Sequence, residues 1–147
     1  MHANPIAPGG VLIREESVLN FPDGIPGFES AKRFALVTVE ELKPFVWLAA
    51  LDEPAVWFLL VDPRLADPDY APGLDPAALA RLGARRPEEV VLFAMAAFKA
   101  GEAGVTVNLK APVAIHPEAR RGAQILLPDP RLGTRHPIAP RRAAHAA

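Results

Sequence analysis

The sequence predicts an all-β protein, a small antiparallel β-barrel-like domain with one short helix, and three observations lead there. Seventeen prolines are spread along 147 residues. A proline inside a helix costs about 3 kcal/mol, so few long helices can form. The intervals between the prolines have the length of strands and are rich in β-branched and aromatic residues. Proline and glycine turns separate these intervals, as they do in small barrels and sandwiches.

The first half of the chain predicts five strands. A polar bend over 14–17 separates the first two, and an acidic turn with Pro54 joins the last two as a hairpin. Both strands of the hairpin are apolar on both faces, so we expect both faces to be covered. The five predicted strands are 11–13, 18–21, 34–39, 45–51 and 56–61.

The second half predicts one helix and four further strands. Asp75 is a good N-cap, Pro76 suits the first helical position, and Gly83 ends the segment, so we expect a helix over 76–82. The stretch 90–98 is interpreted as a strand, although its alanines and the preceding Pro-Glu-Glu also suit a helix. The other predicted strands are 105–109, 113–115 and 124–127.

Composition indicates one globular domain. Half of the residues are hydrophobic and 22% are charged, a composition that is typical of globular rather than disordered chains. We expect a single domain over 11–138, flanked by a flexible segment 1–10 and a flexible basic tail 139–147. The longest uncharged apolar run, 90–98, is about half of the ~18–20 residues that a membrane span needs. The start lacks the pattern of a secretory signal, so we expect a cytoplasmic protein.

The residues offer no catalytic, cofactor or metal site. The chain has no cysteine, which excludes disulfides, thiolate metal ligands and cysteine nucleophiles. Its two serines lie outside any nucleophile elbow, and no phosphate-binding glycine motif occurs. The histidines lack metal-ligand spacing. The acidic residues Asp62, Asp67 and Asp69 lack the glycine and terminal glutamate of a calcium loop. We therefore expect a protein that is not an enzyme.

Charge is distributed unevenly along the chain. Residues 1–74 carry 5 basic and 11 acidic side chains, whereas residues 75–147 carry 11 basic and 6 acidic ones. An alternative hypothesis is a barrel that binds nucleic acid through its basic second half. Barrels that bind single strands interleave exposed aromatic and basic residues, and Phe93 and Phe98 lie in an apolar run that we expect to be buried. The arginines of this alternative are Arg120, Arg121, Arg131, Arg135, Arg141 and Arg142.

Two segments are more specific than a generic barrel requires. In 21–29 two prolines stiffen a loop and two glycines permit positive φ angles. Its Ile25 and Phe28 either plug one end of the barrel, the reading we favour, or contact a partner. In 105–115 the polar Asn108 either makes a structural hydrogen bond, which is again favoured, or belongs to a contact surface.

Five motifs, taken together, resemble the flagellar assembly factor FliW family over about 11–138. They are Phe21-Pro-Asp-Gly-Ile-Pro-Gly-Phe-Glu29, Val61-Asp-Pro with Asp69-Tyr70, Asn108-Leu-Lys-Ala-Pro112, Gly122-x-Gln124 and Arg135-His-Pro-Ile138. They occur in the order and spacing of that family. The sequence departs from the family in its short opening and in His116, where asparagine is common.

The resemblance implies a β-barrel-like fold and a non-enzymatic cytoplasmic regulator without cofactors. It implies two protein partners, flagellin and the carbon storage regulator CsrA, an RNA-binding translational repressor. Flagellin would occupy the protein until export and then release it to sequester CsrA. The positions that the resemblance marks as partner-binding are Phe21, Gly24, Ile25, Pro26, Gly27, Phe28, Tyr70, Asn108, Lys110, Arg135 and His136.

A physical hypothesis for these contacts follows. An exposed groove rimmed by Ile25, Phe28 and Tyr70 would cover an amphipathic helix of flagellin. The acidic first half would attract the basic CsrA.

Overall fold

The computed structural model describes residues 6–7, 11–52, 55–98 and 104–138. The predicted basic tail and most of the predicted flexible start lie outside these residues. The strands are β1 (Ile6–Ala7), β2 (Val11–Leu12), β3 (Leu19–Asn20), β4 (Arg33–Val37), β5 (Val46–Ala50), β6 (Trp57–Val61), β7 (Val91–Phe98), β8 (Val105–His116), β9 (Arg121–Gln124) and β10 (His136–Ile138). The helices are α1 (Pro76–Arg81) and four 3-10 turns, η1 (Glu15–Ser17), η2 (Glu40–Leu42), η3 (Pro63–Leu65) and η4 (Pro87–Glu89).

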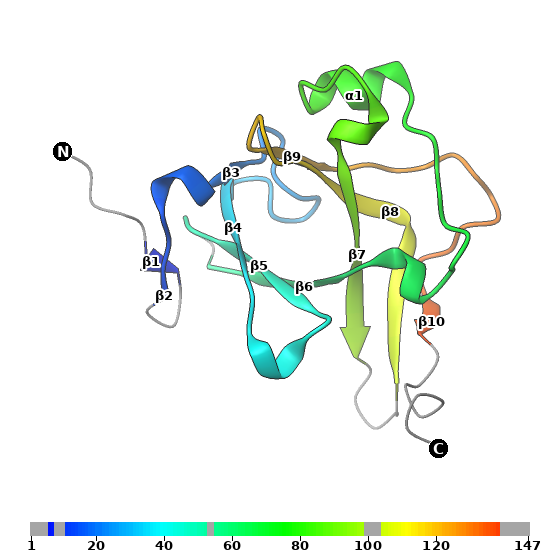
Figure 1. Cartoon of the computed structure of the whole chain (residues 1–147), viewed down its shortest axis with the longest axis horizontal. Coiled ribbons are helices and arrows are strands. Elements are labelled where there is room, and N and C mark those ends of the chain that lie inside the picture. The colour runs from blue at the N-terminus through cyan, green and yellow to red at the C-terminus, as the bar shows by residue number, and fades with distance from the viewer. Residues whose placement is uncertain (1–5, 8–10, 53–54, 99–103, 139–147) are drawn as a thin grey trace.

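Seven strands close into a barrel, which confirms the predicted fold class. The hydrogen-bonded order is β8-β7-β6-β5-β4-β3-β9, and β9 pairs back with β8 to complete the ring. All these pairings are antiparallel except β3 with β9, which meet in parallel at the single pair Asn20 and Arg121. β10 lies outside the ring on β8, and β1 and β2 form a separate small hairpin (Figure 1).

The hairpin of β5 and β6 forms where the sequence predicts it. The two strands pair antiparallel from Val46 with Leu60 to Ala49 with Trp57. Both of their faces are covered, because Leu48 and Leu60 point into the barrel while Ala49 joins the cluster on the outside. The prediction from apolar residues on both faces is therefore confirmed.

The predicted helix is also confirmed, and its limits have local causes. The Asp75 carboxylate accepts the backbone N–H of Ala78 at 2.8 Å, and Pro76 occupies the first position. Gly83 follows with a φ of +68°, the left-handed conformation that commonly ends a helix. Residues 91–98 form strand β7, as interpreted, and only the preceding Pro-Glu-Glu makes a 3-10 turn.

Strand β8 differs from its prediction. We expected two strands interrupted near Pro112, but one strand of 12 residues runs through this proline. Met95 pairs with Asn108 and Phe93 with Val113, so β8 carries three more residues than β7 over the same distance. This bulge comprises residues 108–112. It accommodates Pro112, since a bulge position does not need a ladder N–H. The strand predicted over 124–127 begins earlier and ends at Gln124.

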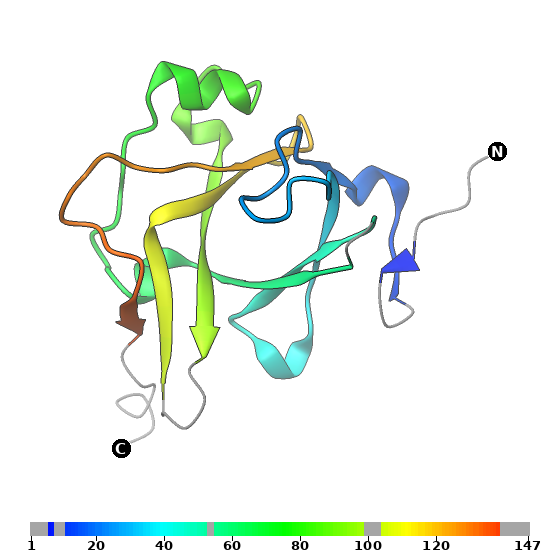
Figure 2. The ribbon, with the colours of Figure 1, turned by 180° about the vertical axis from the view of Figure 1, so that it is seen from behind.

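Three apolar clusters hold the fold together. The first fills the barrel interior and includes Phe21, Phe34, Leu48, Leu60, Val113 and Ile115. The second lies on the outer face of β7, β8 and β9, under α1 and the segments that contain Tyr70 and Ile125. It includes Tyr70, Leu82, Val107, Leu109, Ala114 and Ile125. The third lies outside β4 and β5 under Ile13 and Val18. Figure 2 shows α1 on one side of the molecule and β1 and β2 on the other.

Candidate functional site

The segment 21–31, here called the plug loop, closes part of the barrel. The Gly24 N–H donates to the Phe21 carbonyl at 2.8 Å, and the Phe28 N–H donates to the Ile25 carbonyl at 2.6 Å. Gly24 has a φ of +65°, and a β-carbon there would overlap the backbone of Glu29. The motif thus needs glycine at this position for both its conformation and its close approach.

Burial separates the predicted contact residues of the plug loop. Phe21 and Ile25 are 0% and 2% exposed and belong to the interior cluster. The prediction that Ile25 rims an exposed groove is therefore wrong, because its side chain fills the barrel. Phe28 is 36% exposed, and its ring packs edge-on against Phe58 with centroids 5.3 Å apart. The exposed residues of the loop include Pro26, Gly27 and Phe28.

The bulge of β8 explains the motif around Asn108. The Asn108 side-chain oxygen accepts the N–H groups of Lys110 at 3.0 Å and Ala111 at 2.9 Å. The Gly133 carbonyl also accepts the N–H groups of Leu109 and Lys110, at 3.0 and 3.1 Å. Each N–H that the bulge removes from the strand ladder thereby keeps a partner, as a buried backbone donor requires.

The carbonyl groups of the bulge are satisfied from other segments. The Tyr70 hydroxyl donates to the Leu109 carbonyl at 2.8 Å, and the Gln124 side-chain amide donates to the Ala111 carbonyl at 2.9 Å. The backbone N–H groups of Leu127 and Ile125 donate to the carbonyls of Lys110 and Pro112 at 2.8 and 2.9 Å. The stretch after β9 therefore runs along the bulge without being a regular strand.

The predicted site residue His136 supports the bulge indirectly, through Gly133. Its Nε2 atom accepts the N–H of Gly133 at 2.9 Å, and Gly133 in turn accepts from the bulge. The Lys110 ammonium donates to the Asp129 carbonyl at 3.1 Å. Arg135 is exposed. Tyr70, Asn108, Lys110 and His136 thus meet at the bulge, whereas Phe21, Gly24 and Ile25 belong to the plug loop.

Tyr70 is buried against this bulge, at 7% exposure. Burial raises the pKa of its hydroxyl to about 12, and the nearby carboxylate of Asp67 acts in the same direction. The hydroxyl therefore stays protonated at neutral pH and donates its hydrogen bond. Tyr70 lines two surface hollows, but neither of these includes Ile25 or Phe28, so the expected rim of Ile25, Phe28 and Tyr70 does not form.

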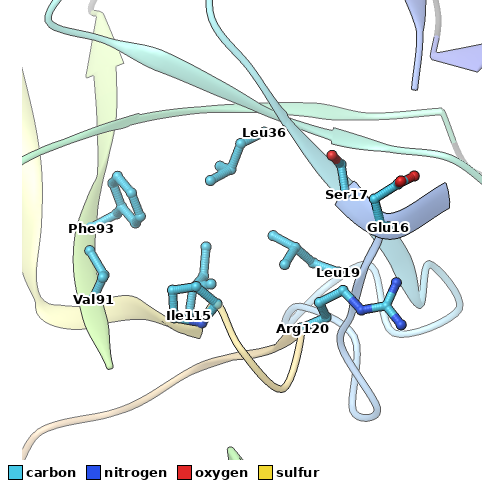
Figure 3. A pocket seen from close by; sticks show the side chains of 9 residues that line it. Glu16, Ser17, Leu19, Leu36, Val91, Phe93, Ile115 and Arg120 are labelled. Carbon is cyan, nitrogen blue, oxygen red and sulfur yellow. The ribbon is translucent and has the colours of Figure 1, made fainter. Parts of the chain in front are cut away.

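Sequence reasoning missed a different surface, which we call the barrel mouth. It is a hollow of about 300 Å³, where the barrel interior opens between β3 and β4 on one side and β7 and β8 on the other. Figure 3 shows its apolar side chains directed toward a common space from several strands. The lining residues are Glu16, Ser17, Leu19, Leu36, Val91, Phe93, Ile115, Pro117 and Arg120.

The barrel mouth presents apolar surface to solvent. Leu36 comes from β4 and Val91 from β7, and they are 36% and 45% exposed. Its charged residues, Glu16 and Arg120, lie together on the side of η1, across from the apolar wall of β7 (Figure 3). The mouth therefore has one apolar side and one charged side. Alternation along single strands could not reveal it, since the surface exists only when four strands come together.

Arg120 takes an unusual conformation at this rim. Its φ is +54°, which is rare for a residue with a side chain, and the Asn20 N–H donates to its carbonyl at 2.9 Å. Its guanidinium donates to the Glu15 carbonyl at 3.1 Å. Backbone strain of this kind persists where the surrounding structure imposes it and often marks functional surfaces.

The described residues offer little reactive chemistry. Among them, no group of three His, Asp or Glu side chains is placed to hold a metal ion. No helix in the described ranges is long and apolar enough to cross a membrane. The lining of the mouth is mainly apolar, and its charged groups form no acid–base dyad with a nucleophile. Its apolar lining suits the mouth to bind an apolar surface.

The two aromatic residues that the nucleic-acid hypothesis concerns differ in burial. Phe93 is half-buried in the mouth, but Phe98 is 65% exposed, so the expectation that both are buried is wrong. Arg131 is bound to Asp129 at 2.9 Å. The arginines at 141 and 142 lie outside the described residues.

Comparisons with known proteins agree over most of the chain. A family model described as FliW protein matches residues 5–138. A flagellar assembly factor FliW of Thermotoga neapolitana is 36% identical over 120 residues, covering 81% of this chain and 80% of that protein. The flagellar assembly factor FliW of Geobacter sulfurreducens is 35% identical, covering 88% and 81%. A crystal structure of a flagellar assembly factor FliW matches with a TM-score of 0.82 at 31% identity, covering 92% of this chain and 96% of that chain.

Proposed function

Because this chain belongs to the FliW protein family, we propose that it is a cytoplasmic flagellar assembly factor that acts by binding other proteins, without catalysis. The single observation that best supports this proposal is the barrel mouth. It is an exposed apolar hollow with a charged side, a combination that suits protein recognition.

We propose two partners, flagellin and CsrA. Flagellin that awaits export occupies the protein and leaves CsrA free to repress flagellin translation. When flagellin is exported, the protein becomes available to bind CsrA and relieve repression. The switch requires only that flagellin binding lowers the fraction of the protein that binds CsrA.

The exposed part of the plug loop is our proposed contact for CsrA. Pro26, Gly27 and Phe28 stand between the exposed acidic residues Asp23 and Glu29. The backbone N–H of Gly27 donates to the Glu29 carboxylate at 3.0 Å and lowers the pKa of that group, so it is ionised at neutral pH. Asp23 is paired with Arg81 at 3.3 Å, so the ionised Glu29 beside the exposed ring is the acidic group that would attract a basic partner and speed its association.

Calorimetric titration of the purified full chain tests both partners. We expect it to bind monomeric flagellin and CsrA separately, and we expect added flagellin to reduce the CsrA that is bound. Affinity for CsrA should fall as salt rises from about 50 to about 500 mM, because screening weakens attraction between exposed charges. A salt-independent affinity would contradict the electrostatic contribution. Failure to bind either protein would contradict the proposed function.

A charge-reversal variant localises the CsrA contact. Glu29→Lys should weaken CsrA binding and reduce its salt dependence. Glu41→Lys changes the net charge equally on an exposed residue outside the plug loop and serves as the control. If both variants weakened CsrA binding equally, the attraction of CsrA would depend on the overall charge of the protein, and the plug loop would not be part of the contact.

A further inference from the structure

We propose that the barrel mouth binds one amphipathic helix, which inserts two apolar side chains about one turn apart and places charged residues against Glu16 and Arg120. This inference rests on the proposed function, in which flagellin supplies the helix, and it replaces the groove that sequence reasoning placed at the plug loop.

The volume of the mouth fits that number of side chains. A dry cavity of about 150 Å³ in a protein core accepts one benzene molecule. The mouth measures about 300 Å³ and therefore has room for two side chains of similar size. Residues three or four positions apart on a helix project on the same face, about 5–6 Å apart, so one helix can supply both.

The apolar lining favours a helix over an extended segment. Leu19, Leu36, Val91, Phe93 and Ile115 present no polar side-chain atoms to an incoming chain. An extended segment would bring backbone N–H and C=O groups that need partners there. A helix satisfies these groups within itself and can place side chains alone in the hollow.

Charge orients the helix. Glu16 and Arg120 are both exposed and stand on the same side of the mouth (Figure 3). The Arg120 guanidinium reaches a backbone carbonyl of Glu15, and its positive charge remains available for an acidic group. We therefore expect the helix to place a basic residue near Glu16 and an acidic residue near Arg120, with its apolar face toward Val91 and Phe93.

Variants in the two walls of the mouth test the proposal against flagellin. Leu36→Asp and Val91→Asp should each weaken the binding of monomeric flagellin about tenfold or more, as substitutions at the centre of an interface do. Leu126→Asp is the matched control, since Leu126 is 73% exposed and lies outside the mouth. It should leave the affinity unchanged. Glu16→Lys should weaken binding at low salt, and this difference should shrink at high salt.

A second measurement does not depend on how the variants fold. Methyl resonances of the isotopically labelled wild-type chain are recorded with and without unlabelled flagellin. We expect the methyls of Leu19, Leu36, Val91 and Ile115 to shift and those of Leu126 to stay in place. Flagellin binding with unshifted mouth methyls would overturn the mouth as the site while leaving the proposed function intact. Absence of any flagellin binding to the wild-type chain would overturn both.

Discussion

The ring of Phe21 occupies the position that a β-carbon on Gly122 would take. Phe21 directly follows β3 and Gly122 lies in β9, so the contact is made where these two strands close the barrel in parallel. One packing contact therefore explains the residue types at two motif positions that are about 100 residues apart. The large ring fills the interior beside the closure, and only glycine leaves space for it.

Gly122→Ala tests this contact. The added methyl group cannot move away from a ring that is itself 0% exposed, so we expect a loss of about 1–3 kcal/mol in the free energy of unfolding. Urea denaturation followed by the fluorescence of Trp47 and Trp57 measures the change. Gly73→Ala is the control, because no heavy atom lies within 4 Å of its built β-carbon. Equal stability of both variants would show that the closure can relax.

Asn108→Ala tests the bulge. It removes the acceptor of two backbone N–H groups and should lower the free energy of unfolding by about 1–3 kcal/mol. Asn108→Asp keeps an oxygen at the same position and should retain most of the stability. If Asn108→Asp were as destabilising as Asn108→Ala, the acceptor would not be the important property of this side chain.

Tyr70 makes an alkaline transition measurable. It is the only tyrosine in the chain, so tyrosinate absorbance reports this hydroxyl alone. Its folded pKa of about 12 lies above the ordinary value of 10.0. The stabilisation that the protonated Tyr70 hydroxyl contributes is therefore complete below pH 10 and is lost as the pH rises through the folded pKa. We expect the absorbance to appear near pH 12, or together with unfolding, and titration near pH 10 in the folded chain would contradict the burial.

The Tyr70→Phe variant separates the hydrogen bond from the titration. It should be less stable than the wild type at pH 7, because the Leu109 carbonyl loses its donor. The difference between the two proteins should narrow above pH 10, where the wild type loses its contribution. Thermal unfolding at several pH values checks this convergence.

Two Asp-Pro-Arg turns predict a loss of stability in acid. Hydrogen bonds from the side chains of Arg64 and Arg131 lower the pKa values of Asp62 and Asp129 respectively. A carboxylate whose pKa is lower in the folded than in the unfolded state stabilises the protein at pH values above its unfolded pKa of about 4. This stabilisation is lost as the pH falls through the folded pKa. The melting temperature should therefore fall below pH 4. Asp129→Asn should reduce this dependence, although the effect is small because Arg131 is exposed.

Local signals account for what the sequence predicted well. The helix begins and ends through Asp75, Pro76 and Gly83, which act within a few residues of one another. The hairpin of β5 and β6 likewise depends on a turn and two adjacent apolar runs. In both cases the interactions that decide the structure lie close together in the sequence.

What the sequence did not predict depends on distant segments. Pro112 suggested an interruption of β8, but the strand continues because Gly133, Gln124 and Tyr70 supply the hydrogen bonds that the bulge lacks. The barrel mouth is likewise invisible until β3, β4, β7 and β8 are assembled. The sequence favours a structural hydrogen bond for Asn108, and its side chain accepts the N–H groups of residues two and three positions further along the chain. The bond from Tyr70 to the Leu109 carbonyl joins residues 39 positions apart, so no local signal predicts it.

The bulge of β8 also exchanges the two faces of the strand. Before it, Val107 points to the outer cluster, and after it Val113 and Ile115 point into the barrel. The exchange follows from an odd number of extra residues, since side chains alternate along a strand. Chain length at this place is therefore subject to a parity rule. Losing one residue would turn Val113 and Ile115 outward, so only changes by two can preserve the orientation of everything downstream.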